Sequence, residues 1–485
     1  MSHVVDYNVR TLHHHCDTKK WNSTSEYGKA LTSYPEATNA SENPEIPDPG
    51  FFTQFEDAGH NQSPTATQCA VHLELLEVFH ALQVKVLTST DLDRTFGLGP
   101  EVSTVYRRRY VTSLQKYINE KVEVRNKTWE ADRAKKWMRF LEYAAERFII
   151  WANKINAEMA MRRTESDSND AGSSDSQDIA LAWLPPLDVL VVWHSFLLNP
   201  SDFNKYCRLE GLNHLVKAPF PWKRTHEAIK SDGPLSYTWA YTLPMRTCHW
   251  LQNKVNIEPI LYDHLVNLGK PVGLTMSSGA SSDTRVVGVL DIDTPKDQST
   301  LAKSLIANVE RQLVFVDKMN AHLWIRSPAL AGTVERAVER YDNFIELFKL
   351  YPGKTLVPTL DVDLVWHTHQ LSASNYSAAI KSRCGRFINH DDKIGKPTLK
   401  NGMKETEELY RIHFGETYSV CLCWECQATV SALDAADQDD NLMSAHPDEL
   451  VAGIGSKVMK QTEYYRAVET ARRRDEVLLP VSSSS

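Results

Sequence analysis

An eight-residue motif that occurs twice constrains the fold of this chain more than any other feature. Residues 187–194 read LDVLVVWH and residues 360–367 read LDVDLVWH, with six of the eight positions identical. A second match lies upstream of each motif, because residues 144–151 read AAERFIIW and residues 337–344 read AVERYDNF. Self-similarity of this kind predicts an internal duplication of one structural unit.

Each copy is predicted to form a long helix, a loop with proline, and a second helix that carries Trp-His. Pro186 and Pro358 lie just before this second helix. Asp188 and Asp361 fall in its first turn, where unpaired N–H groups and the helix dipole favour a carboxylate. The two parts of copy one are further apart than those of copy two, and a polar insert at residues 164–177 roughly accounts for this. The insert is predicted to be a solvated loop.

Helical spacing of apolar residues extends beyond the two motifs. Apolar residues recur in three- and four-residue steps near residues 68–86, 128–155 and 301–350, the pattern of helices with one buried face. In the last of these segments the pattern breaks before Pro328, because proline disfavours helical geometry in the preceding residue. We therefore predict a mainly α fold: a multi-helix single large domain with an internal helix-loop-helix duplication, a disordered N-terminal tail and a polar C-terminal extension.

The expected boundaries follow from changes in composition along the chain. Residues 1–67 are predicted to be a mostly disordered tail, because their many Ser, Thr, Asn and Pro residues cannot repay the entropy of ordering. Residues 68–430 are predicted to form the duplicated helical domain, with copy one at about 128–207 and copy two at about 301–380. Residues 431–485 are expected to form a polar linker and a C-terminal helix.

Charge and motif content narrow the expected partners and the classes of function. The net charge is −8, from 54 basic and 62 acidic residues spread along the chain, so nucleic acid is not an expected partner. No apolar run approaches the roughly 20 residues that span a bilayer, so a membrane is not an expected partner. The candidate partner is therefore another protein. GxGxxG, GxxxxGK[ST] and GxSxG are absent, which leaves dinucleotide, P-loop and serine-hydrolase functions without support.

The N-terminal sequence, MSHVVDYNVR, lacks the apolar segment of a secretory signal. We therefore expect a cytoplasmic location, with the nucleus also compatible. In a reducing compartment the eight cysteines are expected to be thiols or metal ligands.

Copy two carries ionisable and polar residues where copy one is apolar. Asp363, His369 and Gln370 stand where copy one has leucine, phenylalanine and leucine. Asp363, His367 and Gln370 are spaced i, i+4 and i+7, so they can project from one side of a helix. His194, the counterpart of His367, is expected to be a core histidine that a hydrogen bond satisfies. The contrast predicts that copy one is scaffold and that copy two holds a polar site.

The pair His367 and His369 resembles a metal-binding pair, but residues two apart on a helix point about 200° away from each other. Both can bind one ion only if the helix ends there. The favoured metal group is therefore Asp363 and His367 with residues from elsewhere, for which the candidates are His390, Asp391, Asp392 and His194. Two histidines and a carboxylate would suit non-haem iron or catalytic zinc. A hydrogen-bonded polar cluster without an ion is the alternative.

A second cluster contains three cysteines within six residues. Cys421, Cys423 and Cys426 could supply three of the four ligands of a zinc ion. The fourth ligand would come from Cys384, His390 or His413. Small buried thiols packed near Trp424 are an equally acceptable interpretation.

At these repeats the sequence resembles the glycine-rich-domain-containing-protein-like family, whose shared domain has no assigned activity. The matching stretches are LPPLDVLVVWHSFLLNPSDFNKYC at 184–207, RSPALAGTVERAVERY at 326–341, VPTLDVDLVWHTHQLSASNY at 357–376 and INHDDKIG at 388–395. Plant members are known for a glycine-rich C-terminal part, and some are described as having RNA-binding-like features. This chain has only 20 glycines, so those implications do not carry over.

The leading functional hypothesis is an intracellular interaction or scaffold protein with a polar groove at the second Trp-His repeat. The alternative is a metal-dependent enzyme, either a non-haem iron oxygenase or a zinc hydrolase. It would use His367, His369 or His390 together with Asp363 or Asp391. The sequence specifies no substrate, no particular partner and no oligomeric state.

Overall fold

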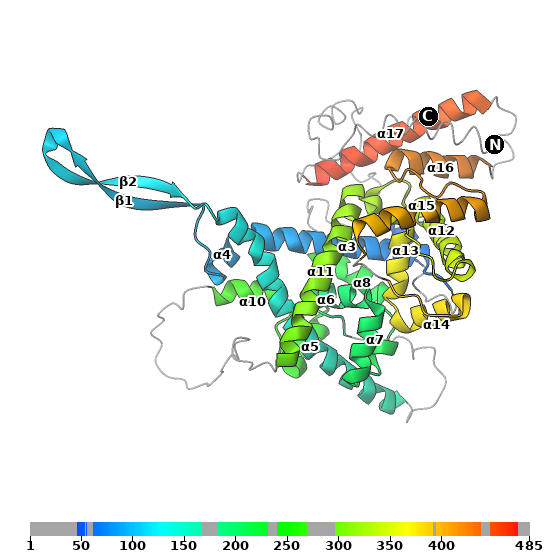
Figure 1. Ribbon diagram of the computed structural model, residues 1–485, viewed down its shortest axis with the longest axis horizontal. Helices are drawn as coiled ribbons and strands as arrows, with labels where there is room; N and C mark the ends of the chain where they lie inside the picture. Colours follow the sequence, from blue (N-terminus) through cyan, green and yellow to red (C-terminus); the bar gives the residue numbers. More distant parts are fainter. Residues whose placement is uncertain are drawn as a thin grey trace.

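The expected mainly helical fold is confirmed by the structure. The computed structural model describes residues 46–53, 55, 62–166, 183–230, 240–269, 296–390, 394–437 and 447–473. Helices form the body of the molecule, and a two-stranded hairpin projects away from it (Figure 1). Within these ranges, no helix is both long enough and apolar enough to cross a membrane.

The helix α3 (Ala66–Thr88) runs through the centre of the body. It begins at a capping box, in which the Thr65 hydroxyl accepts from the Gln68 amide and the Gln68 side chain accepts from the Thr65 amide. Nearly every residue of its first four turns is buried. A helix buried on all sides needs no polar face, and α3 packs against helices of both copies, namely α5, α11, α12 and α13.

The segments aligned as copy one and copy two contain the same order of elements. Copy one forms α5 (Trp129–Ser166), α6 (Leu187–Leu197) and α7 (Pro200–Leu209). Copy two forms α12 (Leu330–Leu350), α13 (Leu360–Gln370) and α14 (Ala373–Cys384). In each copy the long helix packs against the helix that carries Trp-His. The N-terminal part of the polar insert is helical, since α5 continues to Ser166; the rest of the insert lies outside the described residues.

An arginine of the long helix pairs with the aspartate of the Trp-His helix in both copies. The Nε atom of Arg147 lies 2.6 Å from a carboxylate oxygen of Asp188, and that of Arg340 lies 2.7 Å from one of Asp361. Each guanidinium also donates to a main-chain carbonyl at 2.6 Å, that of Glu258 in copy one and that of Tyr418 in copy two. These charge-assisted bonds fix the two helices of each unit relative to one another.

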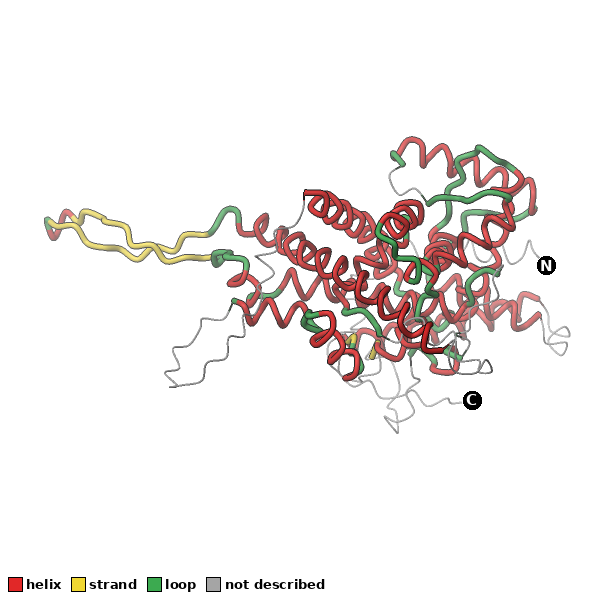
Figure 2. The backbone as a smooth tube through the Cα atoms, turned by 90° about the horizontal axis from the view of Figure 1, so that it is seen from below, coloured by secondary structure: helices red, strands yellow, loops and turns green. Residues whose placement is uncertain are grey.

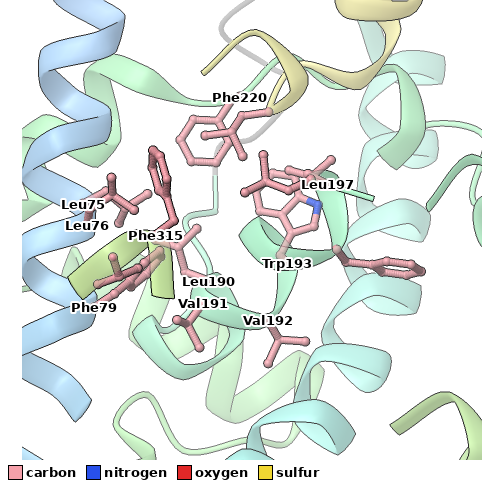
Figure 3. Close-up of a cluster of buried hydrophobic side chains, with 14 of the residues drawn as sticks. Leu75, Leu76, Phe79, Leu190, Val191, Val192, Trp193, Leu197, Phe220 and Phe315 are labelled. Atoms are coloured by element: carbon pink, nitrogen blue, oxygen red, sulfur yellow. The ribbon is translucent and has the colours of Figure 1, made fainter. Parts of the chain in front are cut away.

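The apolar core lies between α3 and the Trp-His helix of copy one. Leu75, Leu76 and Phe79 of α3 face Leu190 and Val191 of α6 (Figure 3). Full burial of one such side chain stabilises the fold by about 1.5–3 kcal/mol. The same cluster extends without a break into copy two, which agrees with the prediction of one large domain.

The remaining helices surround this centre. They are α4 (Asp91–Thr95), α8 (Trp222–Ala228), α9 (Met245–Trp250), α10 (Leu261–Leu268), α11 (Lys296–His322), α15 (Lys396–Phe414), α16 (Trp424–Asp437) and α17 (Pro447–Arg473). Short 3-10 turns occupy Pro49–Phe51, Thr112–Leu114, Leu215–Lys217 and Trp324–Arg326, and a π turn occupies Leu251–Val255. A two-residue pairing joins β3 (Ile229–Lys230) to β4 (Ala240–Tyr241).

The projecting hairpin was not anticipated from the sequence. Its strands β1 (Val102–Val111) and β2 (Lys116–Arg125) are antiparallel, with Val102 opposite Arg125 and Tyr110 opposite Tyr117. It extends well beyond the helices in two perpendicular views (Figures 1 and 2). The signal was present, because these segments are rich in the β-branched and aromatic residues that favour strands.

Part of the region assigned to the N-terminal tail contacts the helical body. Thr67 donates its hydroxyl proton to the carbonyl of Phe51, and the ring of Phe52 stacks on that of His226 with centroids 4.1 Å apart. Residues 1–45 lie outside the described residues.

Candidate functional site

The helix α13 places Asp363 and His367 on one side and His369 on another. Asp363 and His367 are one turn apart, and an oxygen of Asp363 lies 3.4 Å from Nε2 of His367. The helix continues through Gln370 without ending at the His-Thr-His segment. His369 therefore points to a different neighbourhood from His367, as expected for residues two apart on a helix.

His390 reaches the same place from the segment that follows α14. That helix ends at Gly385, whose φ of 68° is the left-handed conformation that lets the chain turn back. The returning segment is held by Tyr376, whose hydroxyl donates to the Ile388 carbonyl at 2.7 Å. Trp366 of α13 donates its indole N–H to the same hydroxyl at 2.9 Å. The Trp366 ring also contacts the His390 ring edge-on, with centroids 4.9 Å apart.

Three ligand-type atoms converge at this point. The Nε2 atoms of His367 and His390 are 3.2 Å apart. The Oδ1 atom of Asp363 lies 3.4 Å from the first nitrogen and 3.7 Å from the second. Both of these contacts are longer than an ordinary N–H···O hydrogen bond of about 2.7–3.2 Å. The spacing instead matches a tetrahedral ion with bonds of about 2.0–2.1 Å, whose ligand atoms are about 3.3 Å apart.

The group is buried on one side and open on the other. The side chain of His367 is 2% exposed and packs on the ring of Phe315, whereas those of His390 and Asp363 are 11% and 22% exposed. Burial alone raises the pKa of the Asp363 carboxyl, but nearby His367, His390 and Lys318 outweigh it and leave that pKa below its usual value. The carboxylate is therefore anionic, the state that a metal ion requires.

His194 lies in a different arrangement, although it is the counterpart of His367. Its Nε2 is 2.9 Å from Nε2 of His72, and Nδ1 of His72 is 2.9 Å from the Thr368 hydroxyl. That hydroxyl donates to the Leu364 carbonyl, so it must accept from His72, and His72 in turn accepts from His194. Burial, with His367 nearby, lowers the pKa of His194 to about 3, so both rings of the pair are neutral.

His369 and Gln370 occupy buried positions away from the three converging atoms. Nδ1 of His369 is 2.8 Å from the hydroxyl of Tyr341, and burial lowers the pKa of this imidazole to about 3. Gln370 is fully buried and its side-chain amide donates to the Trp366 carbonyl at 3.2 Å. Asp391 and Asp392 lie outside the described residues.

The three cysteines of the second cluster also converge. Their sulfur atoms all lie within 4.8 Å of one another. The residues expected to complete this site are elsewhere: the Cys384 thiol contacts the Ile345 carbonyl, His390 lies with Asp363, and His413 packs on Phe414.

One histidine that the fold places beside the site was not predicted from the sequence. His72 lies within the helical pattern near residues 68–86, and it connects the Trp-His helices of both copies through His194 and Thr368. The available signal was a histidine among the regularly spaced apolar residues near 68–86, which is a weak indicator of function.

The expected resemblance to known proteins is confirmed. Residues 290–379 match the family model described as glycine-rich domain-containing protein-like. The chain is 37% identical over 299 residues to Glycine-rich domain-containing protein 1 of Arabidopsis thaliana, covering 57% of this chain and 29% of that protein. It is 33% identical over 141 residues to Glycine-rich domain-containing protein 2 of the same plant, covering 26% and 17%.

The alignments thus span less than a third of the length of either plant relative. No solved structure matches the chain. The family match contains Asp363 and His367 and ends before His390.

Proposed function

We propose that this protein is a metal-dependent enzyme in which Asp363, His367 and His390 bind one divalent transition-metal ion. The observation that carries the proposal is the mutual spacing of Oδ1 and the two Nε2 atoms, at 3.2, 3.4 and 3.7 Å. A cluster without an ion would depend on the contact between the two Nε2 atoms, 3.2 Å apart, and on the longer contact between Asp363 and His390. Here Oδ1 stays further away from both nitrogens, at separations suited to an ion between them.

The partial exposure of the group supports catalysis over a purely structural role. Three protein ligands leave at least one coordination position for water or substrate, and the exposed edges of Asp363 and His390 indicate the side from which either would enter. When bound, zinc would activate a water molecule for hydrolysis, and iron would support oxygen chemistry.

The chain's own residues would prepare this site in two ways. Phe315 and the buried ring of His367 exclude water from the inner side of the group. Trp366 and Tyr376 hold the segment that carries His390 against α13, so the third ligand is positioned before an ion arrives.

The test is the metal content of untagged protein, measured by elemental analysis for wild type and for Asp363→Asn. We expect about one equivalent of iron or zinc less in Asp363→Asn than in the wild type, because the amide cannot replace the anionic ligand. His369→Gln is the matched control, since His369 lies on the same helix but bonds to Tyr341. Equal metal in wild type and Asp363→Asn, or loss only in His369→Gln, would contradict the assignment.

A second candidate function is the interaction or scaffold role, and the projecting hairpin favours it. Residues 102–125 contain six basic and two acidic side chains in a chain of net charge −8. Tyr106 and Tyr117 on this hairpin are 67% and 62% exposed. By contrast, the polar residues of copy two are mostly buried, which offers a docking partner little surface. Unchanged folding and equal metal content in wild type and Asp363→Asn would favour the interaction role.

A further inference from the structure

The cysteine cluster lies where two distant segments are joined by reciprocal hydrogen bonds. Trp324 donates its indole N–H to the carbonyl of Leu422 at 2.9 Å. Trp424 donates its indole N–H to the carbonyl of His322 at 2.8 Å. The C-terminal end of α11 is therefore fixed beside the loop that carries Cys421 and Cys423.

The sulfur geometry suits a metal ion. The Sγ atoms of Cys421 and Cys423 are 3.4 Å apart, and Cys426 lies in the first turn of α16 with its Sγ within 4.8 Å of both. In a tetrahedral zinc site with Zn–S bonds of about 2.3 Å, sulfur atoms are about 3.7 Å apart. The amide of Cys426 also points to Sγ of Cys423 at 3.5 Å, a contact that stabilises a thiolate.

His322, the last residue of α11, lies beside the cluster, although its ring nitrogens are not among the ligand atoms that lie within 4.8 Å of one another. Its carbonyl is the one bound by Trp424, the residue directly after Cys423. Burial lowers the pKa of the His322 imidazole, which favours its neutral form. A neutral imidazole is the form that coordinates zinc. His322 was not among the fourth ligands expected from the sequence. It lies about 100 residues before the cysteines along the chain, so no local pattern connects them.

We propose that Cys421, Cys423 and Cys426 bind a structural zinc ion beside the end of α11, and that rotation of the His322 side chain completes the site and fastens α11 to the start of α16. Binding releases the protons of the three thiols, and the ion takes their place among the sulfur atoms. With all four positions filled by protein, this ion would have no site for water or substrate. Its role is to stabilise the packing of α16, which covers α12 and supports α17.

The first measurement is the absorption spectrum of full-length protein after its metal has been exchanged for cobalt. Thiolate ligands give a charge-transfer band in the near ultraviolet, whereas the Asp363 group contains no sulfur and cannot. We expect this band in wild type and in Asp363→Asn, and its loss in Cys423→Ser. The two metal sites are thereby tested separately, and either can fail without the other.

The second measurement is the melting temperature with and without a zinc chelator. Chelation should lower the melting temperature of Asp363→Asn and leave that of the double variant Asp363→Asn, Cys423→Ser unchanged, because the ion's binding energy contributes to folding. Cys384→Ser is the matched control, since its thiol contacts the Ile345 carbonyl away from the cluster. His322→Asn should weaken zinc binding at least about tenfold.

Two outcomes would overturn the proposal. One is wild-type protein without the cobalt charge-transfer band and without zinc released on thiol modification. The other is a mass two hydrogens lower for the region of Cys421 and Cys423 under non-reducing conditions, which would show a disulfide in place of a metal site.

Discussion

At the scale of single residues, the same histidine position performs different tasks in the two copies. His367 faces a carboxylate at Asp363, whereas His194 has Leu190 one turn before it and pairs with His72. The neutral pair of imidazoles makes its mutual hydrogen bond without charge, and Nδ1 of His194 has no hydrogen-bond partner among the described residues. The exchange of Leu190 for Asp363, together with the different partners His72 and His390, separates a core contact from a candidate metal ligand.

The His194–His72 pair predicts that stability falls in mild acid. The pKa of His194 is depressed to about 3 from an unfolded value of about 6.5. Between these values the unfolded chain binds a proton that the folded chain does not, so stability decreases as pH falls below about 6.5. Lowering the pH from 7 to 5 should cost about 2 kcal/mol through this residue alone.

His194→Gln tests this expectation, because glutamine retains a donor for His72 but does not titrate. Urea unfolding at pH 7 and pH 5 should show a smaller difference in the variant by about 2 kcal/mol. An unchanged difference would mean that other groups determine the acid sensitivity.

At the scale of elements, close approach of backbones decides how α15 packs. An ideal Cβ at Gly402 would lie 2.8 Å from the Thr355 carbonyl oxygen and 2.8 Å from a methyl carbon of Val357. The first of these atoms belongs to the backbone and cannot easily move. At Gly453 of α17, nothing lies within 4 Å of the corresponding position.

These two glycines predict opposite results for the same substitution. Alanine is favoured over glycine in a helix by about 0.5–1 kcal/mol, so Gly453→Ala should stabilise the protein by up to that amount. Gly402→Ala should destabilise it by about 1–3 kcal/mol, because the clash exceeds the helix preference. Urea unfolding of both variants measures the sign, and stabilisation by Gly402→Ala would contradict the close approach.

At the scale of the whole molecule, the helical body carries the hairpin of β1 and β2, residues 102–125. This arm contributes little to the core. The residues of β1 are exposed or half-buried along the strand. Isolated two-stranded hairpins are marginally stable in water. The arm is therefore a part of the surface and not a part of what holds the helices together.

Shortening the arm should leave the body intact. Replacing residues 103–124 with an Asn-Gly turn keeps Val102 and Arg125 paired at the base. We expect the free energy of unfolding to change by less than about 0.5 kcal/mol. A loss of several kcal/mol in urea unfolding would show that the arm packs on the body in solution.

Local spacing predicted part of the candidate site, and the remainder depended on contacts between distant segments. The separation of Asp363 and His367 by one turn, and the divergence of His369, follow from helix geometry and were foreseen. His390 was one of several candidates, because a residue after a turn can approach many positions. His72 and His322 come from other helices, and no local pattern connects them to their neighbours.

The sequence by itself determined the helical class of this protein and the duplicated motif, because apolar periodicity and repeated segments are properties of short stretches of chain. Only the tertiary structure decided which histidines meet, that the cysteines lie beside the end of α11, and that residues 102–125 project as a hairpin. Those outcomes depend on packing between elements up to hundreds of residues apart. The energy of such contacts depends on both partners, so no single segment of the sequence predicts it.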